Sequence, residues 1–149
     1  MQRIKIIISL LVTLFFVSCL NTSDPKEINE AEINGILDEI VLQYNSYQYN
    51  GLDSILEFYS EDFVHNGMDK ADVRHIWEFE RLSEYNTVLI SDVYIDFTDT
   101  ALNAVASFTL TLSNGEEEVV YSEPNDSGES SHFSYLSGEW IIVGNRMEE

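Results

Sequence analysis

The chain has 149 residues, with 27 acidic and 7 basic side chains and a formal net charge of −20. This length fits one domain, and a hydrophobic fraction of 44% is too high for a disordered acidic tail, because that much apolar surface favours a buried core. A chain this negative repels phosphate backbones, so no binding to nucleic acid through a basic face is expected.

Residues 1–18 have the layout of a secretory signal peptide. Arg3 and Lys5 give the chain a positive start, and an almost unbroken apolar run follows over residues 6–17. That run is shorter than the ~20 residues that a helix needs to cross a bilayer. We therefore expect an export signal that is cleaved, not a permanent span.

The segment Phe16–Cys19 reads FVSC and resembles the lipobox of bacterial lipoproteins, in which the cysteine receives a diacylglycerol and becomes the first residue after cleavage. Phe16 stands where Leu is usual. Cys19 is the only cysteine of the chain, so no intramolecular disulfide can form. The resemblance implies a lipid anchor at Cys19, since two or three acyl chains hold a protein stably on a membrane. The alternative is a plain signal peptide with an incidental cysteine.

Residues 19–26 are predicted to form the lipidated cysteine and a short tether, because the stretch after Cys19 is polar, contains Pro25 and lacks periodicity. Leu20 occupies the position where an Asp would resemble the inner-membrane retention signal of enteric bacteria. The expected location is the bacterial cell envelope, with the protein anchored to the outer membrane and facing the periplasm or the cell surface.

The domain is predicted to span residues 27–146 and to begin with three helices. Apolar residues recur every three or four positions over 27–49, on a face that runs from Ile33 to Tyr47, and a shorter helical pattern follows over 52–59. Residues 60–67 are too polar to continue it and predict an extended piece with a turn. Asp69, followed by Asp72, predicts the capped start of a third helix. The apolar face of that helix carries Val73, Ile76, Trp77 and Leu82.

After Asn86 the hydrophobic period changes from 3.6 to 2, which predicts strands. The expected strands and turns are strand 88–97, a turn at 99–100, strand 102–112, a hairpin turn at Asn114-Gly115, strand 117–122, a loop over 123–128, strand 132–136, a turn at 137–138 and strand 139–145. Helices followed by an antiparallel meander predict an α+β domain with the helices on one face of the sheet.

Alternation assigns an inward face to each strand. These inward sets are Leu89, Val93, Ile95 and Phe97; then Leu102, Ala104, Ala106, Phe108, Leu110 and Leu112; and finally Phe133, Tyr135, Trp140 and Ile142. None of these residues is an acid, so the inner face of the sheet is expected to be dry.

Several motifs, taken in their order along the chain, resemble the nuclear transport factor 2-like superfamily, which includes the SnoaL-like polyketide cyclases and ketosteroid isomerase. They are Tyr44 and Tyr47 ahead of residues 51–56 (GLDSIL), residues 58–65 (FYSEDFVH) and residues 137–145 (SGEWIIVGN). The likeness covers nearly all of the chain after the leader. It implies three helices packed on a strongly curved antiparallel sheet that forms a cone, often with a pocket at its mouth and a dimer interface on the outer face of the sheet.

Enzymes of this type need a carboxylate inside the cone and a donor such as Tyr to stabilise an oxyanion. Asp92 and Asp96 share a face with Tyr94 and are expected to point away from the helices, although a bulge would reverse the faces locally. The remaining candidate site is a polar cluster of Tyr44, Asp62 and His65 at the mouth of the cone.

The candidate site residues also have plainer interpretations. Asp62 can brace a turn and His65 can bond the backbone, while Trp77, a further possible pocket residue, can belong to the core. His75 and Glu78 lie three apart on a helix, but a surface pair explains them better than a metal site. No metal or cofactor is expected.

Three functions remain open. The first is a lipid-anchored extracytoplasmic protein whose domain binds a small molecule or a protein partner without chemistry. The second is a SnoaL-like or isomerase-like enzyme that uses Tyr44, Asp62 and His65. The third is a homodimeric structural module that uses the outer face of the sheet, around Tyr94, Val105 and Tyr121. A cavity below a few hundred Å³ that is filled by the domain's own aromatic side chains would leave no room for a ligand and would favour the third.

Overall fold

The computed structural model describes residues 25–98, 101–121 and 129–145. The predicted signal peptide, Cys19 and the turn at 99–100 lie outside these residues, as does the predicted loop over 123–128. Within the described ranges, no helix has the length and apolar character that a membrane crossing requires.

Helix α2 (Pro25–Tyr47) has the predicted apolar face, and it is followed by the 3-10 turn η1 (Gln48–Gly51) and by helix α3 (Leu52–Glu57). Tyr47 does not belong to that face, because it lies where the helix ends and is 55% exposed. The buried side chains of α2 are Ile33, Leu37, Ile40 and Tyr44.

Helix α4 (Lys70–His75) begins with the capping box that the sequence predicts. The side chain of Asp69 accepts two backbone N–H groups of the first turn, and the carboxylate of Asp72 accepts the N–H of Asp69 at 3.0 Å. The chain then continues as a π-helical segment, η2 (Ile76–Arg81). A short hairpin of β1 (Val64–His65) and β2 (Met68–Asp69) precedes α4.

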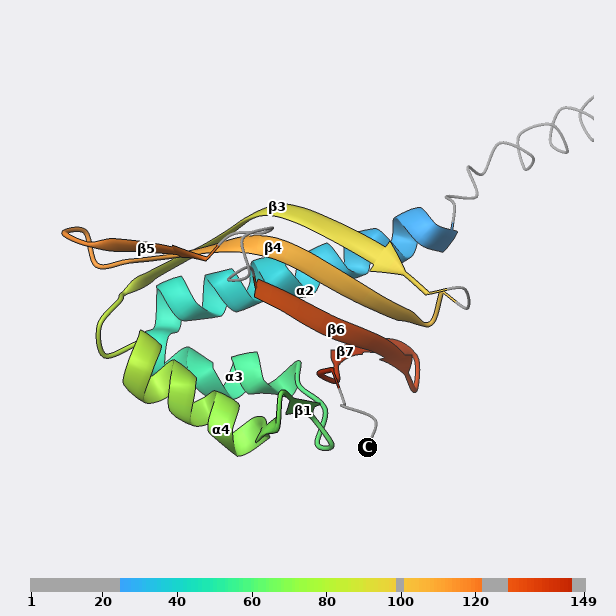
Figure 1. The fold of residues 1–149 in the computed structure, drawn as a ribbon, viewed down its shortest axis with the longest axis horizontal. Helices are drawn as coiled ribbons and strands as arrows, with labels where there is room; N and C mark the ends of the chain where they lie inside the picture. The colour runs from blue at the N-terminus through green and yellow to red at the C-terminus, as the bar shows by residue number, and fades with distance from the viewer. Residues whose placement is uncertain (1–24, 99–100, 122–128, 146–149) are drawn as a thin grey trace, which may run out of the picture.

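A bent antiparallel sheet of five strands covers the helices from one side, so the α+β layout is as predicted (Figure 1). The order of strands is β3-β4-β6-β7, and β5 pairs with β4 as the second half of a hairpin. The strands are β3 (Thr87–Phe97), β4 (Asn103–Ser113), β5 (Glu118–Tyr121), β6 (Glu129–Leu136) and β7 (Glu139–Ile142).

A bulge in β3 corrects the predicted inward face of this strand. The pairing with β4 shifts between Ser91 and Tyr94, and Asp92 there has φ 52. Val88, not Leu89, is therefore buried in the first half of the strand, and Leu89 is 54% exposed. One extra residue changes which side chains face the helices.

The remaining differences in the predicted faces are few. Val93 is exposed at the bulge, and Leu102 and Tyr135, which lie close to strand ends, are also exposed. The acids Asp92 and Asp96 face solvent, as predicted.

The core contains only hydrophobic side chains among the described residues; no polar or charged residue is buried there. Aromatic residues predicted to belong to the core do so, with Phe63, Trp77, Phe108 and Trp140 buried and Phe97 packed against them. The buried cluster begins at Ile33 and ends at Ile142. A chain that starts at Leu20 keeps this whole cluster, and we expect it to fold by itself.

Candidate functional site

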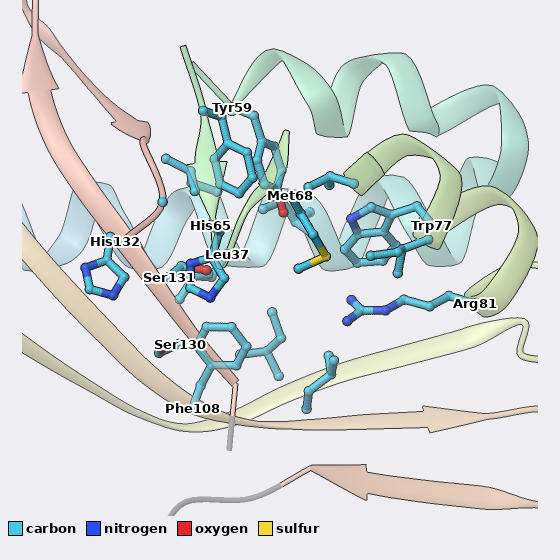
Figure 2. Close-up of a pocket in the computed structure, with 18 residues that line it drawn as sticks. Leu37, Tyr59, His65, Met68, Trp77, Arg81, Phe108, Ser130, Ser131 and His132 are labelled. Atoms are coloured by element: carbon cyan, nitrogen blue, oxygen red, sulfur yellow. The ribbon is translucent and has the colours of Figure 1, made fainter. Parts of the chain in front are cut away.

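A cavity lies inside the cone, between the concave face of the sheet and the helices (Figure 2). Its walls are mostly apolar and include Leu37, Ile90, Phe108 and Leu110. Its volume is about 130 Å³, which is below the ~300–1,000 Å³ of sites for drug-sized ligands. It is close to the ~150 Å³ of an apolar cavity that admits benzene. The space therefore suits a molecule of about one six-membered ring.

The π-helical segment η2 supplies one end of this cavity. The N–H of Leu82 donates to the carbonyl of Trp77 at 2.9 Å, five residues back, and π-helical turns of this kind are frequent at functional sites. The guanidinium carbon of Arg81 lies 4.6 Å from the centre of the Trp77 ring, a cation–π contact. Both side chains line the cavity, and Figure 2 shows the guanidinium reaching towards its middle.

The opposite end is polar and is formed by His65 of β1 and His132 of β6, whose ring centres are 5.9 Å apart. Ser130 and Ser131 line the cavity beside them (Figure 2). Burial lowers the pKa of His132 below its ordinary value of 6.5, and the neighbouring His65 lowers it further. His132 is therefore neutral at pH 7 and can donate or accept a hydrogen bond.

The electrostatics of the cavity differ from those of the chain as a whole. The chain carries 27 acidic residues, yet no Asp or Glu is among the described side chains that line the cavity. Arg81 is the one Lys or Arg among them. The cavity is thus an apolar space with the Arg81 cation at one end and hydrogen-bonding side chains at the other.

The structure brings together only part of the predicted site. His65 and Trp77 line the cavity, whereas Tyr44 and Asp62 are not among its lining residues. Tyr44 is fully buried, and its hydroxyl donates to the carbonyl of Tyr85 at 2.8 Å. Burial raises the pKa of Tyr44 to about 12, against the opposing effect of the nearby Arg81 charge.

Asp62 lies in an exposed turn, and its backbone N–H donates to the hydroxyl of Ser60 at 3.2 Å. This contact fits the interpretation of Asp62 as part of a turn. His75, which was considered with Glu78 as a metal pair, packs against an aromatic side chain: the centres of the His75 and Phe79 rings are 4.8 Å apart. Nowhere in the described ranges do three ligand-type side chains gather in a way that could hold a metal ion.

Sequence reasoning missed Arg81, Ser131 and His132 as cavity residues. Arg81 follows Trp77 by four positions, a helical spacing that brings two side chains together. Ser131 lies two residues before the buried Phe133 and pairs with the inward-facing Ala106, so strict alternation along β6 would have placed it inside. No sequence signal predicts the approach of His132 to His65.

The outer face of the sheet includes two of the three residues that were predicted there. Tyr94 is 68% exposed and Val105 is half-buried on that side. Tyr121 was placed there wrongly: it pairs with the buried Leu110 and packs against the core, because the hairpin register sets it on the inner face.

Solved structures with the same architecture identify the class of fold. A nuclear transport factor 2-like protein of unknown function from Shewanella oneidensis matches with a TM-score of 0.58 and 11% identity, over 77% of this chain and 94% of that one. A protein with a cystatin-like fold from Nostoc punctiforme matches with a TM-score of 0.55 and 13% identity, over 77% and 86%. A nuclear transport factor 2-like protein from Novosphingobium aromaticivorans matches with a TM-score of 0.54 and 11% identity, over 91% and 84%.

These likenesses show that the chain has the nuclear transport factor 2-like, or cystatin-like, fold. No protein-family model matches the sequence, and no curated protein matches it. At such low identity the shared architecture says nothing about activity, because one fold serves many functions.

Proposed function

We propose that this chain is a lipid-anchored protein of the bacterial cell envelope whose domain binds a small molecule, of about one ring, in the cone cavity without chemistry. The observation that carries the proposal is the apolar cavity of about 130 Å³ with polar groups at both ends. Its small volume limits the ligand but leaves room for one, since benzene enters a cavity of ~150 Å³. Proton-transfer enzymes of this fold class need a carboxylate in the cone, and none is among the described lining residues.

Binding in the cavity can be tested with a neutral one-ring probe on the chain that starts at Leu20. Benzyl alcohol is expected to shift the indole N–H resonance of Trp77 in proton–nitrogen correlation spectra, in a saturable way. Ser131→Phe fills the cavity and is expected to abolish the shift. Ser134→Phe is the matched control, because Ser134 pairs with Asn103 and lies on the other face of the same strand. An unperturbed Trp77, or equal binding by a folded Ser131→Phe variant, would overturn the proposal.

The anchor has its own test. Cells that express the full chain are expected to incorporate labelled palmitate into it, and Cys19→Ser is expected to remove the label and release the protein from the membrane fraction. Label that survives Cys19→Ser would show that this cysteine is not the site of acylation.

A homodimeric module is the second candidate, and exposed apolar side chains on the outer face of the sheet favour it. Leu89, Tyr94 and Val120 are 54%, 68% and 49% exposed, and exposed apolar patches often mark interaction surfaces. Sedimentation equilibrium of the wild type and of Tyr94→Ser tests this candidate. A dimer that Tyr94→Ser dissociates would support it, and a monomeric wild type would exclude it.

A further inference from the structure

We infer that the ligand of the cone cavity is a small organic acid whose carboxylate binds to the guanidinium of Arg81, while its apolar body lies between the sheet and η2. This inference rests on the proposed function and specifies the chemical class of the ligand at the same site.

The first argument is the placement of Arg81 relative to the other described cations. Lys26 lies 3.8 Å from Glu30, Lys70 lies 2.6 Å from Glu61, and Arg74 pairs with Asp53. None of these six residues lines the cavity. Arg81 is the one Lys or Arg among the described side chains that line the cavity.

The second argument is the electrostatic setting of that cation. Apolar walls lower the effective dielectric constant, so a charge there interacts more strongly with an anion than it would in water. None of the 27 acids of the chain is among the described side chains that line the cavity. An anionic ligand would therefore meet a local positive charge inside a protein whose overall charge repels anions. Selectivity for an acid must then come from this site and not from long-range attraction.

The third argument is the geometry of the guanidinium. Its contact with the Trp77 ring, at 4.6 Å, holds it at the wall of the cavity and fixes a flexible side chain in advance of binding. Arg presents its N–H groups as a planar fork that matches both oxygens of a carboxylate. The buried Trp77 ring also offers an apolar surface to the body of the ligand.

The far end of the cavity limits the rest of the ligand. The hydroxyl group of Ser131 and the imidazole of His132 can bond a neutral polar substituent. The volume of about 130 Å³ leaves no space for a fused ring system. A one-ring acid such as a benzoate fits both limits.

The test compares benzoate with benzyl alcohol, two probes that share a ring and differ in charge. On the chain from Leu20 onwards, titration calorimetry at pH 7 is expected to show benzoate binding about 10- to 100-fold more tightly, the range that a charge-assisted bidentate pair supports. Arg81→Gln is expected to remove this preference and to leave the affinity for benzyl alcohol within about threefold of wild type. Arg74→Gln removes the same charge from the surface pair with Asp53 and is expected to change neither affinity.

Each outcome points to one conclusion. If benzyl alcohol binds and benzoate binds no more tightly to the wild type, the inference fails while the proposed function stands. The inference also fails if Arg81→Gln weakens both probes equally, or if Arg74→Gln removes the preference as well. If neither probe binds, the proposed function itself fails. The comparison on the wild type decides the question even if Arg81→Gln does not fold.

Discussion

The side-chain amide of Asn45 is expected to hold the end of α2 to the beginning of β3. Its Nδ2 donates to the carbonyl of Val88 at 2.9 Å, and its Oδ1 accepts the N–H of Val88 at 2.8 Å. The amide thus makes with one residue of β3 the two backbone hydrogen bonds that a neighbouring strand would otherwise make. Because Tyr44 also bonds the carbonyl of Tyr85, two consecutive residues of α2 fix the segment that leads from Arg81 into the sheet.

We predict that Asn45→Ala lowers the free energy of unfolding by about 2 kcal/mol more than Asn34→Ala does. Each of the two partly buried hydrogen bonds contributes about 1 kcal/mol net. Asn34 lies in the same helix and bonds the carbonyl of Glu30 at an exposed position, so both variants gain the same helix propensity and the gain cancels in the comparison. For a domain of this size, 2 kcal/mol corresponds to about 6–10 °C in Tm.

Urea unfolding followed by circular dichroism, together with scanning calorimetry, measures this difference. Asn45→Asp makes the comparison depend on pH. Its carboxylate can still accept the N–H of Val88, but at neutral pH it has no proton to donate and it faces the carbonyl oxygen of Val88. Its stability relative to Asn45→Ala is expected to improve as the carboxylate is protonated. Equal stabilities of Asn45→Ala and Asn34→Ala, within about 0.5 kcal/mol, would show that the bidentate contact contributes nothing.

The remaining predictions concern the closing strand, acid and alkali. Gly144 has φ 75, and a Cβ there would lie 2.1 Å from the carbonyl oxygen of Val64, whereas Gly138 has φ 101 and open space around it. Gly144→Ala is therefore expected to lower the urea midpoint of unfolding clearly more than Gly138→Ala does, and equal midpoints would contradict the clash. Burial lowers the pKa of His132 below 6.5, so near this pH the unfolded chain binds more protons than the folded one. The free energy of unfolding of the wild type is therefore expected to fall slightly as the pH drops through 6.5, and His132→Gln is expected to remove this fall. Identical pH profiles of stability for the wild type and His132→Gln would refute this. Burial raises the pKa of Tyr44 to about 12, so unfolding releases a proton above pH 10. The free energy of unfolding is therefore expected to fall as the pH rises above 10, and this dependence on pH should be weaker in Tyr44→Phe.

The order of elements could be predicted because local signals and tertiary packing agree. The carboxylates of Asp69 and Asp72 cap each other's backbone at the start of α4, which two acids at this spacing favour in any context. The hairpin turn at Asn114 also follows local chemistry, since its side-chain oxygen accepts the N–H groups of Glu116 and Glu117 at 3.0 and 2.8 Å. The positive φ of 86 at Gly115 completes that turn.

The cavity could not be predicted to the same degree, because two departures from regular geometry build it. The bulge in β3 occurs at Asp92, with φ 52, and not at a glycine that would mark it in the sequence. The π-helical turn that carries Trp77 and Arg81 has no sequence signal that marks it. The contact between His65 and His132 joins segments far apart in the chain, and periodicity within one element cannot report it.

The bulge also decides which chemistry the interior of the sheet can offer. Val88 pairs with Leu112 ahead of the bulge, and Ile95 pairs with Ala106 behind it, so both halves of β3 turn aliphatic side chains towards the helices. A straight strand that kept the first half in place would instead turn Tyr94 and Asp96 inwards and Ile95 outwards, because alternation is strict. A phenol and a carboxylate facing a closed hollow are the groups that proton abstraction requires. A slip of one position in the second half of a single strand therefore separates this interior, with no carboxylate among its described lining residues, from one equipped for acid–base work.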